Sequence, residues 1–369
     1  MQYGNLGRTE LKISSIGLGT WAFNSLVYGP VEKRVALETI RTAIDGGINF
    51  FDTAPLYGND EKDGIAEVIL GEGLKGCRQQ MIISSKFGRK PTQGNRADFC
   101  AKSTRIFVEE SLRRLETDYL DILFFHSPFS ANEIQDDVWD ELDRLKEAGS
   151  IRFVGHSISM LDKTELMARE WAEERKIDVI QVVYSLLFRG SEKLIRNLGE
   201  KNIGIVARES LANGFLSGTI KEDTIFDSGT LNARYSKEEI ASRVLRVKEL
   251  SFLLRDPVET MPQAALRWVL DNNNICTVLT GAKNSFEVRD CTRASEHPRY
   301  SIEEHEKAKA NRFGRRRDVT VAARPPGGGA QPRDRPLFPA GSEPASARPQ
   351  IGQFEAEEEE LLSTMQDAD

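Results

Sequence analysis

The sequence predicts a (β/α)8 barrel with an N-terminal hairpin and a disordered C-terminal extension. Short apolar runs typical of strands alternate with segments of helical periodicity between residues 16 and 296, and such alternation indicates a parallel sheet. The connections are short and polar, which favours closure of that sheet into a barrel. An open doubly wound sheet is the runner-up, but the first strand ends in G-L-G-T-W-A-F rather than in G-x-G-x-x-G.

The first half of the chain contains the hairpin and four strand–helix units. Residues 2–14 predict the hairpin, because Leu11 and Ile13 alternate with polar residues after a turn at Gly7 and Arg8. Each helix that follows carries apolar residues at helical spacing. The expected strands span 16–19, 48–52, 81–86 and 120–126, and the expected helices span 32–46, 61–75, 101–116 and 134–148.

The second half repeats this alternation and adds an insertion. The expected strands span 153–157, 179–183, 203–207 and 277–280, and the expected helices span 161–175, 191–200, 261–272 and 285–296. Periodicity also predicts buried helix faces, and Ile106, Leu112 and Leu115 are expected to line one of them in the first half. The insertion from about 213 to 258 contains an amphipathic helix at 237–254. Loops of this kind at a barrel mouth decide substrate identity.

Composition limits the classes of function. The net charge of −7 over 369 residues argues against a nucleic-acid surface, which needs a concentrated cationic face. The sequence shows neither a signal-peptide pattern nor a membrane-spanning apolar run, so we expect a soluble, cytoplasmic protein without a membrane partner. The four cysteines are scattered, with no C-x-x-C and no nearby histidine, so they predict neither a metal site nor disulfides. The oligomeric state is left open.

The composition changes near Gly314. Residues 325–349 contain seven of the fourteen prolines and a glycine triplet, and such a segment buries too little apolar surface to offset its chain entropy. The stretch 355–369 is acidic and is either a short helix or unstructured. We therefore expect a barrel domain at 1–313 and a disordered tail at 314–369.

Four polar residues follow or end successive strands. Residues 49–58 read N-F-F-D-T-A-P-L-Y-G, which places Asp52 at the end of the second strand and Tyr57 in the loop after it. Lys86 ends the third strand and His126 ends the fourth. The C-terminal ends of barrel strands meet at one face, where the active sites of such barrels lie. We therefore expect these four side chains to lie close together.

These residue types suit the reduction of a carbonyl group. Tyr57 would donate the proton, and an adjacent Lys86 ammonium would favour the phenolate and so lower the tyrosine pKa. Asp52 would neutralise and hold Lys86, and His126 would orient the carbonyl oxygen. Each residue alone also has an ordinary structural explanation, such as a loop cap, a packing side chain, an ion pair or a buried histidine. Their order on successive strand ends favours the catalytic interpretation.

Asp–x4–Tyr followed by Lys and His on the next two strands resembles the aldo-keto reductases. The resemblance covers roughly residues 1–312 and implies a nicotinamide-dependent enzyme that reduces a small-molecule carbonyl with these four residues. It also implies cofactor contacts in G-T-W, G-H-S, I-Q-V-V-Y-S, S-L-A-N-G-F-L and G-A-K-N with the helix after it. The cofactor-binding residues so expected are Thr20, Trp21, Ser157, Gln181, Arg208, Ser210, Leu211, Gly214, Leu216, Gly281, Ala282, Lys283, Glu287, Asp290 and Cys291.

The positively charged residues indicate which cofactor and which class of substrate the protein uses. Lys283 lies before a helix N-terminus, where an anion is favoured, and could receive the 2′-phosphate of NADPH. This favours NADPH over NADH, although a solvated lysine is the ordinary alternative. Arg208, Arg89 and the few aromatic residues at 85–100 indicate a polar carbonyl substrate, such as a sugar-like aldehyde or ketone.

The chain departs from the family pattern at three positions. Ile158 replaces an asparagine that contacts the nicotinamide carboxamide, Arg208 replaces a tyrosine that stacks on the ring, and Cys291 replaces an asparagine of the last helix. We expect Arg208 to reach the barrel mouth, with Glu209 or the cofactor phosphates able to cancel its charge. Two other functions stay open: a nucleotide-sensing subunit built on the same barrel, and a metal-dependent isomerase.

Overall fold

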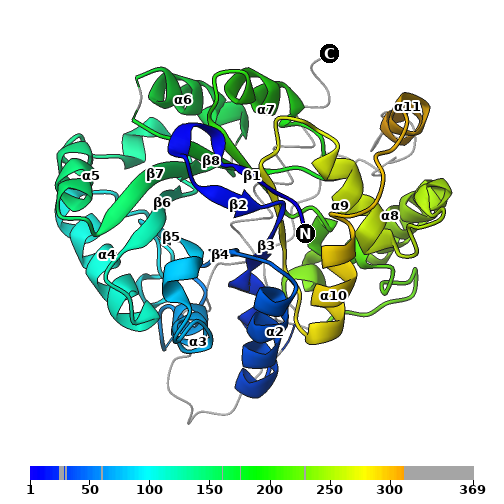
Figure 1. The fold of residues 1–369 in the computed structure, drawn as a ribbon, viewed down its shortest axis with the longest axis horizontal. Helices are drawn as coiled ribbons and strands as arrows, with labels where there is room; N and C mark the ends of the chain where they lie inside the picture. Colours follow the sequence, from blue (N-terminus) through cyan, green and yellow to red (C-terminus); the bar gives the residue numbers. More distant parts are fainter. Residues whose placement is uncertain are drawn as a thin grey trace, which may run out of the picture.

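The computed structural model describes residues 1–310 except 25–28, 30, 60, 160, 175, 228 and 229. These residues form the predicted closed barrel of parallel strands, in which the last strand pairs with the first (Figure 1). The barrel strands are β3 (Ile16–Gly19), β4 (Phe50–Asp52), β5 (Ile82–Phe87), β6 (Leu120–His126), β7 (Ile151–Ser157), β8 (Val179–Val183), β9 (Gly204–Arg208) and β10 (Thr277–Thr280). The predicted tail lies outside the described residues.

The helices surround the strands (Figure 1). They are α2 (Lys33–Asp45), α3 (Ile65–Gly73), α4 (Ala101–Leu115), α5 (Asp137–Glu147), α6 (Leu161–Glu173), α7 (Glu192–Gly199), α9 (Met261–Leu270) and α10 (Ser285–Arg293). The insertion contains the predicted helix as α8 (Lys237–Glu249), and α11 (Ile302–Ala310) was not predicted. Within the described part of the chain, no helix is long and apolar enough to cross a membrane.

Two details of the helices differ from the prediction. Helix α3 begins at Ile65 rather than near residue 61, because Gly64 has a left-handed φ of +61° and its N–H binds the carbonyl of Pro55 at 2.7 Å. The expected buried face of α4 is wrong at Ile106, which is 38% exposed. The face that packs inward is formed by Thr104, Phe107, Val108, Ser111 and Leu115. Small polar residues complete this face, so a pattern of apolar residues alone misplaces it.

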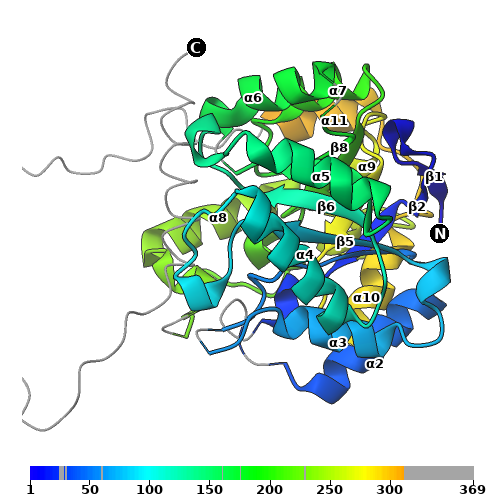
Figure 2. The same cartoon turned by 90° about the vertical axis from the view of Figure 1, so that its left-hand side faces the viewer.

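The hairpin closes one end of the barrel. Strands β1 (Tyr3–Asn5) and β2 (Lys12–Ser14) pair antiparallel, and Leu6 between them packs against Gly204 at the start of β9. Leu6 and Ile13 join Phe50 and Phe124 in a buried cluster at this end. Figure 2 shows the hairpin and α8 at opposite ends of the molecule. The end of the barrel where the strands terminate is therefore the one left for a site.

An aromatic cluster fills the space between the barrel and helices α5 and α6. The ring of Phe125 lies 5.1 Å from that of Trp139 and 4.8 Å from that of Trp171, and His156 lies 5.0 Å from Trp171. His156 is fully buried, and neither of its ring nitrogens has a hydrogen-bond partner among the described residues. Burial lowers the pKa of His156 from 6.5 to about 3. The folded protein therefore contains this imidazole in its neutral form.

The first prediction concerns acid stability. A histidine whose pKa is depressed by folding stabilises the fold fully above the unfolded pKa, and this contribution is lost as the pH falls. When the pH is lowered from about 7.5 to about 5, His156 should therefore reduce the unfolding free energy of the wild-type protein by roughly 2 kcal/mol. His156→Phe lacks the titrating group and should not show this loss. Urea unfolding at both pH values measures the difference. Trp171→Phe, which repacks the same cluster without removing a titrating group, should keep the full pH dependence. An equal pH dependence in wild type and His156→Phe would contradict the assignment.

Candidate active site

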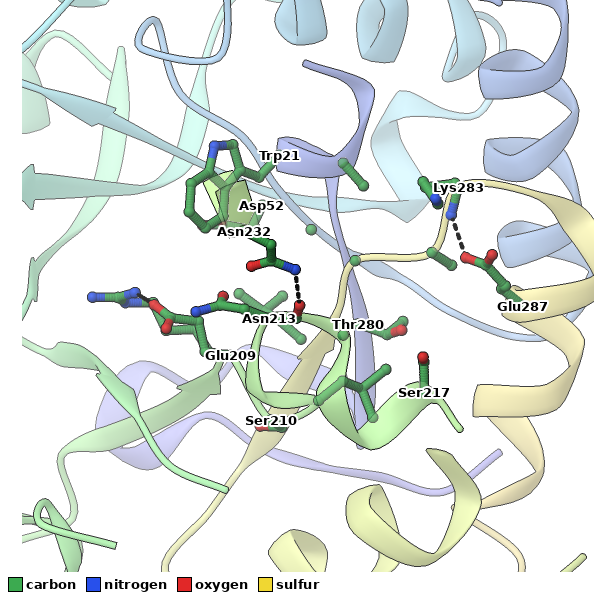
Figure 3. A pocket seen from close by; sticks show the side chains of 18 of the residues that line it. Trp21, Asp52, Glu209, Ser210, Asn213, Ser217, Asn232, Thr280, Lys283 and Glu287 are labelled. Atoms are coloured by element: carbon green, nitrogen blue, oxygen red, sulfur yellow. Dashed lines mark hydrogen bonds and ion pairs between the residues drawn. The ribbon is translucent and has the colours of Figure 1, made fainter. Parts of the chain in front are cut away.

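A cavity of about 580 Å³ opens at the C-terminal ends of the barrel strands. Every barrel strand contributes a residue at or near its end to the wall, as Figure 3 shows for part of the cavity. These residues are Gly19, Asp52, Lys86, His126, Ser157, Gln181, Arg208 and Thr280. The loops after the strands supply the rest of the lining, including Trp21 and Tyr57.

Lys86 is the centre of a buried hydrogen-bond network. Its ammonium donates to Asp52 Oδ2 at 2.7 Å, to the Tyr57 hydroxyl at 2.8 Å and to the carbonyl of Thr53 at 3.0 Å. The side chain is only 1% exposed, and burial lowers the pKa of Lys86 while Asp52 opposes that shift. Because Lys86 donates to the phenol oxygen, the phenol proton of Tyr57 points away from Lys86.

The second carboxylate oxygen of Asp52 extends this network across the barrel. Asp52 Oδ1 accepts hydrogen bonds from Ser84 Oγ at 2.7 Å and from Gln181 Nε2 at 2.9 Å. Gln181 in turn accepts from Ser157 Oγ at 3.1 Å. Ser157 and Gln181, two of the residues expected to bind the cofactor, are thus fixed by the same carboxylate that holds Lys86.

His126 and Trp21 enclose the Tyr57 ring. Trp21 stacks on Tyr57 with the ring centres 6.2 Å apart, and His126 meets the Tyr57 ring edge-on at 6.1 Å. Burial, followed by the charges of Lys86, Arg89 and Arg208, holds the pKa of His126 well below 6.5. His126 is therefore neutral at physiological pH and offers one N–H donor and one acceptor nitrogen.

Arg208 lies at the barrel mouth, as predicted, but its charge is balanced locally. Its guanidinium pairs with Glu209, the next residue, and donates to Ser159 Oγ at 3.0 Å and to the carbonyl of Ile158 at 3.2 Å. The side chain of Ile158 itself is buried. Because the Glu209 carboxylate lies beside the guanidinium, Arg208 does not place an uncompensated positive charge in the cavity.

Arg89 does not reach the cavity, which corrects one argument for a polar substrate. The residue is 3% exposed and donates to the carbonyls of Asn95, His126 and Ser127 at 2.9, 3.2 and 3.2 Å. It also forms an ion pair with Glu133 at 2.9 Å. Arg89 therefore fastens the loop after β5 to the end of β6 and has no donor directed at a substrate.

The loop after β9 and the start of α10 form the far end of the cavity. Asn232, from the insertion, donates to the carbonyl of Asn213 at 2.8 Å and so ties the insertion to this loop (Figure 3). At α10, Glu287 accepts from the main-chain N–H of Lys283 at 2.8 Å (Figure 3). It also accepts from the side-chain amide of Asn284 at 2.9 Å. Among the described residues, no carboxylate pairs with the ammonium of Lys283.

Most of the expected site residues line the cavity, but two do not. Thr20 is buried beside it and donates to the carbonyl of Asp52 at 3.1 Å, and Leu216 belongs to the core. Asp290 lines the cavity but is bound by Thr260 and Gln263. The lining also includes residues that the sequence did not single out, among them Leu56, Asn95, Ser127, Ser159, Asn232 and Phe286. Leu56, Ser127 and Phe286 are sequence neighbours of expected site residues, and this adjacency is the local signal that could have found them.

Comparison with known proteins gives consistent matches. The model of the Aldo/keto reductase family matches residues 15–311. The chain is 32% identical over 306 residues to the NADH-specific methylglyoxal reductase of Escherichia coli (strain K12), covering 77% of this chain and 90% of that protein. It is 33% identical over 293 residues to L-galactose dehydrogenase of Arabidopsis thaliana, covering 77% and 85%. An aldo-keto reductase structure from Bacillus halodurans, in its holo form, aligns with a TM-score of 0.68 and 26% identity over 84% of this chain and 96% of that chain.

Proposed function

Because the chain belongs to the aldo/keto reductase family of NAD(P)H-dependent oxidoreductases, we propose that it reduces a polar aldehyde or ketone with NADPH and with Tyr57 as proton donor. The observation that supports this most strongly is the single ammonium of Lys86, which donates to both Asp52 and Tyr57. We place the activity in the barrel domain, residues 1–313.

The proton is delivered by Tyr57. An ordinary phenol, with a pKa of about 10, is a weak acid at neutral pH. The Lys86 ammonium at 2.8 Å stabilises the phenolate that remains after the proton has left. Asp52 holds Lys86 in place and balances its charge while Tyr57 still carries its proton. A subunit that only senses nucleotides has no need of this complete relay, so the geometry favours the enzyme.

The carbonyl oxygen is positioned by His126. A neutral imidazole can donate one N–H to that oxygen, and the His126 ring lies edge-on to Tyr57 in the wall of the same cavity. Trp21, stacked on Tyr57, excludes water from one side of the Tyr57 ring. When bound, the reduced nicotinamide supplies the hydride. Ser157 and Gln181 would hold its carboxamide.

NADPH rather than NADH suits the far end of the cavity. The ammonium of Lys283 has no carboxylate partner among the described residues, and both this ammonium and the N-terminus of α10 favour an anion there, as the 2′-phosphate requires. Glu287 carries the opposite charge, but its carboxylate oxygens already accept two N–H groups. The relative from Escherichia coli is named NADH-specific, so the preference has to be measured on this chain.

The second prediction tests the proton donor. Tyr57→Phe should bind the cofactor as wild type does, because only the hydroxyl is lost, and should lower kcat on the order of a hundredfold. Nicotinamide fluorescence titration and steady-state reduction of a carbonyl panel measure the two quantities. Tyr119→Phe is the matched control, since its hydroxyl binds Gln79 at 3.2 Å outside the cavity. Near-normal turnover by Tyr57→Phe would refute the assignment.

The third prediction tests the cofactor. Lys283→Ala should raise the dissociation constant of NADPH on the order of tenfold and leave that of NADH nearly unchanged, because only NADPH carries the 2′-phosphate. Lys12→Ala, on the hairpin at the opposite end of the barrel, should change neither constant. If Lys283→Ala weakened the binding of NADPH and NADH equally, Lys283 would not contact the 2′-phosphate.

A further inference from the structure

One part of the cavity wall carries polar side chains that carbonyl reduction itself does not use. Asn95 is 5% exposed, and neither the oxygen nor the nitrogen of its amide has a hydrogen-bond partner among the described residues. Ser127 and Ser159 line the same cavity and are equally buried. A buried amide without a partner lowers stability, so its retention in a ligand cavity points to a partner supplied by the ligand.

Arg89 fixes this part of the wall relative to His126. Its guanidinium donates at once to the carbonyls of Asn95, His126 and Ser127, at 2.9 to 3.2 Å. The loop that carries Asn95 and the strand end that carries His126 are therefore held as one unit. Its ion pair with Glu133 compensates the buried charge, so the role of Arg89 is positional.

The backbone at both residues is in an unusual conformation. Asn95 has a φ of +58° and Ser127 a φ of +50°, both in the left-handed region that residues other than glycine seldom adopt. Asparagine tolerates this region better than serine does. Strained backbone of this kind persists mainly where the surrounding structure enforces it, and it concentrates at functional sites.

A chain of hydrogen bonds ends at the Ser127 hydroxyl. Arg208 donates to Ser159 Oγ at 3.0 Å, and Ser159 Oγ donates to Ser127 Oγ at 2.6 Å. Ser127 uses its oxygen as the acceptor in this chain and keeps its own proton for donation. Because hydrogen bonds in such a chain polarise one another, the donation by Arg208 at its head strengthens that final donor.

We propose that Asn95 and Ser127 form a subsite for a hydroxyl group adjacent to the carbonyl, so that the substrates are hydroxylated aldehydes and ketones. A hydroxyl both donates and accepts, which matches an amide with both functions unused and a serine that donates. Ser127 directly follows His126, so the subsite lies next to the position proposed for the carbonyl oxygen. An unsubstituted substrate would leave these buried groups unpaired and is discriminated against. This inference rests on the function proposed above.

The test compares hydroxyacetone with acetone, and 3-hydroxybutanone with butanone. For each pair, the ratio of kcat/KM values in a variant is divided by the ratio in wild type, which cancels the intrinsic reactivity of the carbonyls. Asn95→Gly and Ser127→Gly remove the side chains and accept the left-handed backbone, so they avoid added strain. Glu116→Gly is the matched control, because Glu116 also has a positive φ of 51° but lies at the end of α4, outside the cavity.

Asn95→Gly and Ser127→Gly should each lower the preference for the hydroxylated partner by roughly five- to tenfold, while Glu116→Gly keeps it. An unchanged preference in both cavity variants would overturn the subsite and leave the proposed function standing.

Saturation-transfer NMR of the same ligands with the oxidised cofactor present needs no turnover. If no carbonyl is reduced but hydroxyacetone still binds better than acetone, and Asn95→Gly abolishes that difference, the reductase function fails and the subsite stands. Equal binding of both ligands to wild type would overturn the subsite.

Discussion

The buried ammonium of Lys86 is the interaction on which the site depends. A cation that is 1% exposed is tolerated only because all its donors are used, by Asp52, Tyr57 and Thr53. The barrel register provides this arrangement. Asp52 pairs with Ser84, and Lys86 lies two residues further along β5, so both side chains of β5 face the interior one above the other. Ser84 then holds one oxygen of Asp52 while Lys86 binds the other.

The two cations near the strand ends of the cavity are each balanced by a neighbouring carboxylate. Lys86 is matched by Asp52, and Arg208 by Glu209. His126 is kept neutral by its own burial and by the cations around it. Within the described residues, Lys283 at the far end is the cavity-lining cation without such a partner. The cavity therefore combines locally balanced charges near Tyr57 with a positive charge near α10. This distribution suits the proposed binding of a neutral carbonyl substrate and of NADPH.

The local pattern of the sequence was sufficient to predict the barrel and the clustering of the four proposed catalytic residues, because three of them lie at or next to the ends of strands that apolar runs mark clearly and Tyr57 lies in the loop after one of these strands. It was not sufficient where a role depends on contacts distant in sequence. The charge of Arg89 suggests a substrate contact, but its guanidinium is bound by the carbonyls of Asn95, His126 and Ser127. Asn95 carries no sequence signal, since its place in the cavity depends on that same clamp. Helix α11 was missed because it is nearly all polar; it is held through Asp271, which His305 contacts at 3.0 Å.

The central claim is that the charge of Lys86 makes Tyr57 an effective proton donor near neutral pH. The most direct test is the pH dependence of kcat/KM for carbonyl reduction at saturating cofactor, in wild type and in Lys86→Met. Tyr57 must carry its proton to donate it, so the rate falls at alkaline pH as the coupled Lys86–Tyr57 pair loses a proton. With the ammonium present this fall should begin below about pH 10, the ordinary tyrosine value, and in Lys86→Met it should move to higher pH with a lower plateau. A fall at the same pH in both proteins, with circular dichroism showing both folded, would contradict the claim.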